Sequence, residues 1–180
     1  MKVKHQIKTF TAWVPISNLV DWYYESVGRR QKYAGDIAEA TTGKKFKGDN
    51  YYFDKEEAIK RSPFFMTTPV EKRRESKLFI YTGIHDGYQG SVPITQSLKF
   101  YNKVVRDFDP TEKASLVSIE EMLMMVERRN TDILNPTQTN HGDILFSKQY
   151  LDKIQVSVFE GRHEMIPEKA LVMMKANKDL

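Results

Sequence analysis

No cysteine occurs among the 180 residues of the sequence. Disulfide bonds, zinc sites built from thiolates and cysteine nucleophiles are therefore excluded, although the redox compartment stays open. The histidines show no metal-ligand spacing, and each taken alone is more typical of a structural or exposed side chain than of a ligand; they are His5, His85, His141 and His163. The sequence therefore predicts no metal site.

The sequence also has no long apolar run. No window approaches the about 20 apolar residues of a transmembrane helix, and the start MKVKHQIKTF lacks the apolar core of a signal peptide. We therefore expect a soluble chain without a membrane partner, and its localisation stays open.

A large excess of one charge is absent as well. Twenty-eight basic residues stand against 24 acidic ones, and the formal net charge of +4 is too small to require a nucleic-acid partner. The basic clusters are short and scattered, which favours a solvated surface; they lie at residues 29–32, 44–47, 72–74 and 128–129. Tyr51 and Tyr52 beside the second cluster faintly resemble a base-stacking platform, but no nucleic-acid-binding pattern accompanies them. We expect no nucleic-acid partner.

The sequence does contain enough apolar residues for a packed core, with 40 % hydrophobic and 12 % aromatic residues. Its length is typical of a single domain. Three segments have the composition of strands: residues 7–16, 77–84 and 154–159. The middle one, KLFIYTGI, is a nearly continuous apolar run, which is typical of a strand buried on both faces in a parallel sheet.

Helices are predicted between these strands from capping signals and apolar spacing. The expected helices lie at residues 18–28, 31–40, 54–61, 93–108 and 118–126, and a last one begins at Pro167. Residues 41–52 have the composition of an exposed loop or lid, and residues 130–142 that of a loop before a brief strand at 144–146. Strands and helices that alternate along the chain in this way indicate an α/β fold.

Two ionisable residues follow directly after predicted strands. Asp86 comes after residues 77–84 and His163 after residues 154–159, each in a glycine-containing turn. Taken singly, Asp86 is typical of an Asp-Gly turn and His163 of an exposed loop histidine. The carboxyl ends of parallel strands meet at one edge of a sheet, however, and there a carboxylate can orient an imidazole. An aspartate before a histidine is also the second half of the Ser, Asp, His order of α/β-hydrolases.

Four stretches carry a resemblance to a known family: TFTAWVPISNLVDWYYES, LFIYTGIHD, Ser91-Val92-Pro93 followed by Gln96-Ser97, and VFEGRHEM. Together they resemble the carboxyl-terminal half of an α/β-hydrolase of the prolyl oligopeptidase type, the S9-like serine peptidases and their esterase relatives. The resemblance covers nearly the whole chain but only the later half of the family's domain. It implies a three-layer, partial α/β-hydrolase fold with a mostly parallel sheet and a helical inserted segment at about residues 111–153, which would form a lid or a partner-binding surface.

The resemblance also implies roles for single residues. It makes Asp86 the acid and His163 the general base of a Ser-Asp-His triad that acts on a peptide or an ester without a cofactor. The chain departs from the family in several respects. Its nine glycines bracket no serine as Gly-x-Ser-x-Gly, and the upstream loop that would donate an oxyanion-hole amide is absent. Asp86 and His163 are 77 positions apart (163 minus 86), which is longer than is usual in the family, and residues 87–91 lengthen the interval between the acid and Val92-Pro93. Ser17 and Ser91 lie near strand ends but outside any nucleophile elbow.

The expected function is therefore that of a serine-hydrolase domain that is incomplete as given. Its expected partners are a complementary amino-terminal half or a second copy of the chain. The alternative is a non-catalytic hydrolase remnant that acts as a protein-binding module. The sequence identifies neither the substrate nor the choice between peptidase and esterase.

Overall fold

The computed structural model describes residues 8–48, 51–73, 75–127 and 140–176, and the last four of these by their backbone alone. The chain divides into two compact units. Met1–Pro15 and Thr68–Leu180 form the first, which we call the sheet unit, and Ile16–Thr67 form the second, which we call the helical unit. Both lie within the span of residues 1–180 that the sequence indicates as one domain, and that interpretation stays a prediction.

The sheet unit contains four strands among its described residues, in the spatial order β1-β2-β4-β3. They are β1 (Thr9–Trp13), β2 (Lys77–Gly83), β3 (Ile144–Tyr150) and β4 (Ile154–Phe159). β1 pairs with β2 and β2 with β4 in parallel, whereas β3 runs antiparallel to β4. The prediction that the three strands of the sequence analysis are parallel neighbours is confirmed, although β1 is shorter than residues 7–16 and Ile7 lies outside the described residues.

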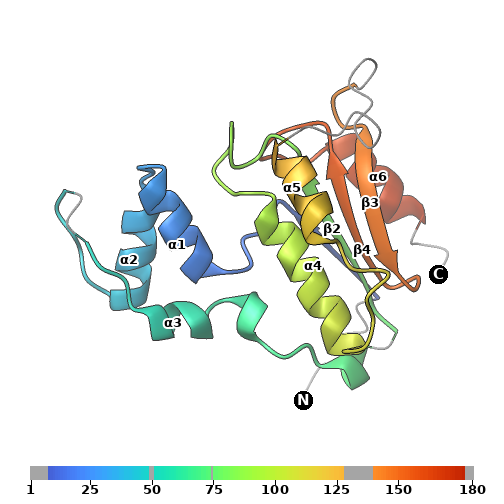
Figure 1. Ribbon diagram of the computed structural model, residues 1–180, viewed down its shortest axis with the longest axis horizontal. Helices are drawn as coiled ribbons and strands as arrows, with labels where there is room; N and C mark the ends of the chain where they lie inside the picture. The colour runs from blue at the N-terminus through green and yellow to red at the C-terminus, as the bar shows by residue number, and fades with distance from the viewer. Residues whose placement is uncertain (1–7, 49–50, 74, 128–139, 177–180) are drawn as a thin grey trace. The chain divides into compact units, whose positions relative to one another are not determined.

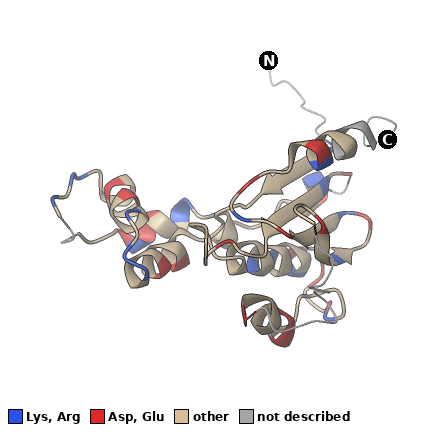
Figure 2. Ribbon diagram, turned by 90° about the horizontal axis from the view of Figure 1, so that it is seen from above, with Lys and Arg blue, Asp and Glu red and all other residues tan. Residues whose placement is uncertain are grey.

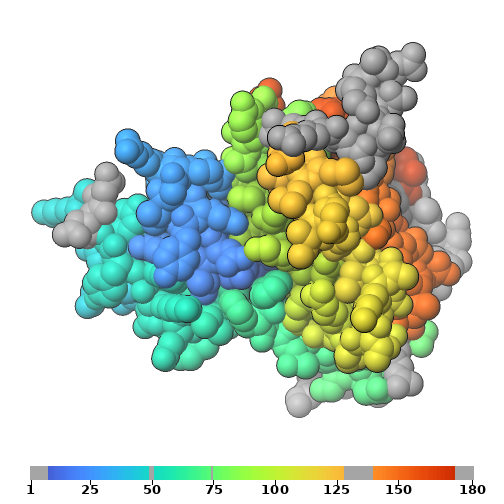
Figure 3. All heavy atoms as spheres, in the orientation of Figure 1, coloured from blue at the N-terminus to red at the C-terminus, as the bar shows by residue number. Residues whose placement is uncertain are grey.

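Helices cover both faces of this sheet. α4 (Thr95–Phe108) and α5 (Ile119–Glu127) lie on one face and α6 (Pro167–Ala176) on the other (Figure 1). In the space-filling view, the atoms of α4, of α5 and of the segment that joins them largely cover the face of the sheet unit that is turned toward the viewer (Figure 3). The sheet unit is thus an α/β structure with an open, mostly parallel sheet, which is compatible with the predicted three-layer class.

The core between α4 and the sheet follows from the two periodicities of strand and helix. Alternate residues of a strand point to the same face of the sheet. On the face covered by α4, three such residues are fully buried: Ile80, Val156 and Val158. They pack against residues that share one side of α4, namely Leu98, Tyr101 and Val105. Burial of this apolar surface is the main stabilising contribution to the sheet unit.

A buried polar residue of α4 fixes the segment that follows the helix. The Asn102 side chain donates a hydrogen bond to the Val117 carbonyl oxygen at 2.8 Å and accepts one from the Val117 N–H at 2.9 Å. The Ser118 hydroxyl and the Glu121 carboxylate then cap α5 reciprocally, as the sequence predicts. Within the predicted inserted segment, the structure describes α5 and β3, whereas residues 128–139 lie outside the described residues.

The opposite face of the sheet is aromatic. Trp13 stacks on Tyr81 at a ring-centroid distance of 4.4 Å and meets the edge of Phe159 at 5.7 Å. Burial raises the pKa of Tyr81 to about 12. Together with Ile166 these rings border an apolar hollow of about 580 Å³ beside α6.

The helical unit consists of α1 (Leu19–Gly28), α2 (Tyr33–Thr42) and α3 (Lys55–Lys60). Asn18 caps α1 and Asp54 caps α3, as predicted. The expected boundaries of α2 are wrong by two residues. Thr41, expected in an exposed loop, is buried in the last turn of α2, because its hydroxyl accepts a hydrogen bond from the Asp54 N–H and so ties α2 to the start of α3.

Basic and acidic positions are interspersed along the ribbon (Figure 2). In the tyrosine pair beside the second basic cluster, Tyr51 packs against Tyr23 at a centroid distance of 6.4 Å, and Tyr52 accepts a hydrogen bond from Lys44 at 2.7 Å. Both tyrosines therefore have packing or hydrogen-bond partners within the helical unit. The basic cluster at residues 128–129 and His5 lie outside the described residues.

One ion pair of α4 makes the stability of the sheet unit depend on pH. Burial raises the pKa of Asp107, but hydrogen bonds from Lys103, at 2.5 Å, and from Thr68 outweigh this effect and leave the pKa lower than usual. A lowered pKa stabilises the fold above the unfolded value of about 3.9, and this contribution is lost as the pH falls through the folded value. We expect Asp107→Asn to lower the free energy of unfolding by about 1–2 kcal/mol at pH 7 and by less at an acidic pH well below the unfolded pKa of about 3.9, as measured by urea unfolding. An equal loss at both pH values would contradict this.

Candidate functional site

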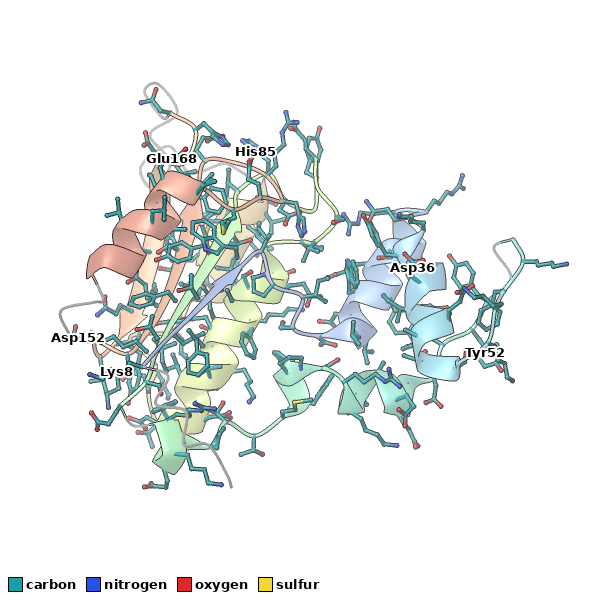
Figure 4. All side chains as sticks on the ribbon, turned by 180° about the vertical axis from the view of Figure 1, so that it is seen from behind. Lys8, Asp36, Tyr52, His85, Asp152 and Glu168 are labelled. Atoms are coloured by element: carbon teal, nitrogen blue, oxygen red, sulfur yellow. The ribbon has the colours of Figure 1, made fainter. Side chains whose placement is uncertain are left out.

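Asp86 and His163 lie at the carboxyl edge of the parallel strands. Asp86 follows β2 and His163 follows β4, and these two strands are hydrogen-bonded neighbours. Figure 4 labels His85, the residue before Asp86, at one end of the sheet, whereas Lys8 and Asp152 lie at the other end, where β1 and β4 begin. This edge is where open α/β sheets place functional side chains.

The turn after β2 needs glycine for a steric reason. Gly87 has a φ of +82°, which side-chain-bearing residues rarely adopt, and a Cβ there would lie 2.5 Å from the Cα of Pro93. The Asp86 N–H bonds back to the Gly83 carbonyl oxygen at 3.0 Å, which starts the turn. The chain therefore reverses within a few residues, and Asp86 is held inside the turn.

Asp86 is fixed at both of its carboxylate oxygens. Oδ1 accepts hydrogen bonds from the N–H groups of Gly87, at 2.9 Å, and Val92, at 3.0 Å. Oδ2 lies 2.7 Å from Nδ1 of His163. The residue is only 4 % exposed, so neither oxygen can rotate away without leaving buried groups unpaired.

His163 is held on one side of its ring only. A carboxylate accepts hydrogen bonds but does not donate them, so we assign the Nδ1 proton to the bond with Asp86. In the part of the chain that the structure describes, Nε2 has no hydrogen-bond partner, and the side chain is 38 % exposed. Neutral His163 thus presents an unpaired basic nitrogen, and the structure brings together the two residues that the sequence singled out.

At two further glycines near this pair, a side chain would have no room. A Cβ on Gly90 would lie 2.2 Å from Oδ1 of Asp86 and 3.1 Å from the Cβ of His163. A Cβ on Gly161 would lie 2.5 Å from the Phe159 ring. Any side chain at Gly90 would therefore compete for space with the two predicted site residues.

A second pair of side chains, which was not predicted from the sequence, lies at the same edge. Nε2 of His85 lies 2.6 Å from Oε1 of Glu160. His85 directly precedes Asp86, and Glu160 directly follows β4, so the position of each at a strand end was the signal. The pair borders a polar hollow of about 500 Å³, which Gln89 and His141 also line.

The candidate nucleophiles lie in different places. Ser17 belongs to the helical unit and is 2 % exposed, so no substrate reaches its hydroxyl in this conformation. Ser91 is partly buried in the turn between Asp86 and α4. Among the described residues, Asp86 makes the only hydrogen bond to the His163 ring, and neither serine is paired with it.

No cluster of three histidine or acidic side chains suited to a metal ion is found in the described ranges. Nor is any helix in those ranges both long and apolar enough to cross a membrane.

No family model, curated protein or solved structure matches the chain. The family resemblance of the sequence is therefore a proposal, supported by the residues and by the geometry described above.

Proposed function

We propose that the chain is the part of a serine hydrolase of the prolyl oligopeptidase type, a peptidase or an esterase, that carries the acid and the base of a Ser-Asp-His triad. The observation that carries the proposal is the 2.7 Å contact between the buried carboxylate of Asp86 and Nδ1 of His163, with Nε2 left unpaired. The order of the parallel strands, with both residues at their carboxyl edge, supports a partial α/β-hydrolase fold.

In this proposal His163 works as a proton shuttle. Nε2 accepts the proton of a serine hydroxyl while the serine oxygen attacks the substrate carbonyl carbon, and the imidazolium then passes that proton to the leaving group. Asp86 holds the ring in the tautomer with the proton on Nδ1 and stabilises the imidazolium. Its two backbone hydrogen bonds keep the carboxylate in place during this cycle.

The serine nucleophile is proposed to come from polypeptide beyond these 180 residues, since the sequence contains no Gly-x-Ser-x-Gly. β1 offers a place for that polypeptide. It is the edge strand of the sheet in the described part of the chain, and an edge strand presents unpaired N–H and C=O groups that another strand can pair with.

The first test is labelling with a fluorophosphonate probe. The isolated chain is expected to take up no probe and to hydrolyse activated esters no faster than background, because acid and base alone provide neither a nucleophile nor an oxyanion hole. A polypeptide that supplies the upstream strands and a Gly-x-Ser-x-Gly elbow is expected to restore labelling when mixed with the chain. The readout is gel fluorescence, followed by mass-spectrometric location of the label.

The matched control is the same upstream polypeptide with its elbow serine replaced by alanine, which should stay unlabelled with the chain. Labelling of the isolated chain at Ser17 or Ser91 would overturn the proposal that the nucleophile lies elsewhere. Binding of the upstream polypeptide without any labelling would instead favour the second candidate, a non-catalytic remnant that binds proteins.

A separate observation favours the second candidate, the non-catalytic remnant that binds proteins. The edge strand β1 ends in Trp13, which borders the apolar hollow of about 580 Å³. A strand edge beside an apolar hollow fits a protein partner, whether a complementary half or a second copy of the chain.

A further inference from the structure

We propose that His85 and Glu160 form a positioning pair that holds the turn of Asp86 against the turn of His163. The inference rests on the proposed function, because it explains how the acid and the base stay in register. Neither residue forms a hydrogen bond with the His163 ring, so both act through the backbone that they join.

His85 and Glu160 each lie close in the sequence to one residue of the proposed dyad. His85 is bonded covalently to Asp86, and Glu160 lies three positions before His163. Their side chains meet at 2.6 Å and are 28 % and 27 % exposed, so water screens the interaction only in part. The contact therefore joins the two turns directly, at the base of each.

The backbone shows why such a link is needed. Beyond the ladder of β2 and β4, two hydrogen bonds continue the pairing, from Ile84 N–H to the Phe159 oxygen at 2.9 Å and from His85 N–H to the Gly161 oxygen at 3.0 Å. No further backbone hydrogen bond joins the two turns among the described residues, and both turns contain glycine. The side-chain pair adds a link where the sheet ends.

Glu160 is itself well anchored. Its N–H donates to the Asp143 oxygen at 2.8 Å, and its carbonyl oxygen accepts from the Gly142 N–H at 2.6 Å. These bonds tie Glu160 to the segment that leads into β3. The turn of Asp86 is thus attached through His85 to a residue that is held on both sides.

The pair also contains an unpaired buried atom. Nε2 of His85 faces a carboxylate oxygen and carries the proton, so Nδ1 of the neutral ring is an acceptor. In the described part of the chain Nδ1 is buried and has no hydrogen-bond partner. A buried nitrogen without a partner destabilises the fold, and a leucine here would avoid that cost. The arrangement is better explained by a need for the hydrogen bond to Glu160 than by packing.

The hydrogen bond between Asp86 and His163 is sensitive to small displacements of one turn relative to the other. A hydrogen bond weakens steeply once its heavy atoms separate beyond about 3.2 Å or its angle falls. The 2.7 Å contact of Asp86 with His163 therefore depends on the relative position of two glycine-containing turns.

The test uses the full chain labelled with ¹⁵N-histidine and needs no nucleophile. In the wild type, the Nδ1 proton of His163 should appear as a low-field resonance, and its ring ¹⁵N shifts should report a single tautomer. In Glu160→Ala we expect this resonance to be lost to solvent exchange and the ¹⁵N shifts to average toward both tautomers. Glu160→Gln keeps an oxygen that accepts from Nε2 of His85 and should retain the resonance.

Two variants separate positioning from stability. Asp107→Asn destabilises the sheet unit through a different contact and should leave the His163 signals unchanged, as should Glu120→Ala, which removes an exposed carboxylate from α5. His85→Leu removes the other partner of the hydrogen bond and is expected to change the His163 signals in the same way as Glu160→Ala. It also serves as the test if Glu160→Ala does not fold.

The outcomes distinguish this inference from the proposed function. A wild-type spectrum without the His163 resonance, or with the proton on Nε2, contradicts the dyad itself. A wild-type resonance that persists in folded Glu160→Ala and His85→Leu leaves the dyad standing and overturns the positioning role. Loss of the resonance in Asp107→Asn as well would show that the pair contributes only general stability.

Discussion

Replacing His163 by alanine is expected to lower the kcat/KM of the complemented hydrolase by about 10³- to 10⁶-fold. Alanine leaves the serine hydroxyl without a base and the leaving group without an acid, while binding and oxyanion stabilisation remain. The measurement is hydrolysis of an activated ester by the chain mixed with an upstream polypeptide that carries the Gly-x-Ser-x-Gly elbow. Fluorophosphonate labelling of the elbow serine should fall in parallel.

The matched control for this change is His141→Ala. His141 lines the polar hollow at the same edge of the sheet, but it is exposed and lies 3.6 Å from Glu164 in a loose ion pair. Its loss should change kcat/KM by less than about threefold, because a surface ion pair contributes little. A His163→Ala enzyme as active as the His141→Ala enzyme would refute the role proposed for His163.

Gly90→Ala is expected to break the contact between Asp86 and His163 in the isolated chain. The new Cβ would lie 2.2 Å from Oδ1 of Asp86, so the carboxylate or the turn has to move. Such overpacking costs about 1–3 kcal/mol of unfolding free energy. We expect that loss in urea unfolding, together with loss of the low-field Nδ1 proton of His163 in the NMR spectrum.

Gly28→Ala provides the comparison, because a Cβ there would meet no atom within 4 Å. Gly28 is the last residue of α1 in the helical unit, and alanine favours the helix, so stability should be unchanged or slightly higher. The His163 signals should be unaffected by this change. A Gly90→Ala chain with wild-type stability and an intact Nδ1 resonance would contradict the steric account of the turn.

Much of the sheet unit follows from local patterns in the sequence. The apolar run of β2 and the alternation in β4 each indicate a strand, and strands separated by helices favour parallel pairing through crossovers. Asp86 and His163 stand just after two such strands, which is why the sequence predicts that they meet. The caps at Asn18, Asp54 and Ser118 are equally local, since each side chain bonds to the backbone two or three residues ahead.

Other features depended on neighbours distant in the sequence. The sequence predicts a brief strand at residues 144–146, but β3 continues through the polar residues Ser147, Lys148 and Gln149 because the backbone of β4 pairs with them. Thr41 and Asn102 are buried because their side chains hydrogen bond to Asp54 and Val117. Polar residues of this kind are expected at the surface, and hydrogen-bond partners outside their own helices contribute to making their burial favourable.

The sequence by itself determined which segments form the parallel strands and which two ionisable residues end them, because hydrophobic period and turn composition are properties of neighbouring residues. The tertiary structure alone decided how the acid is held. The contact of Asp86 with His163, the approach of Gly90 to the Cβ of His163 and the approach of Glu160 to His85 require turns from separate strands to be placed within a few tenths of an ångström. Such positions follow from packing of the whole sheet unit, which no local pattern encodes.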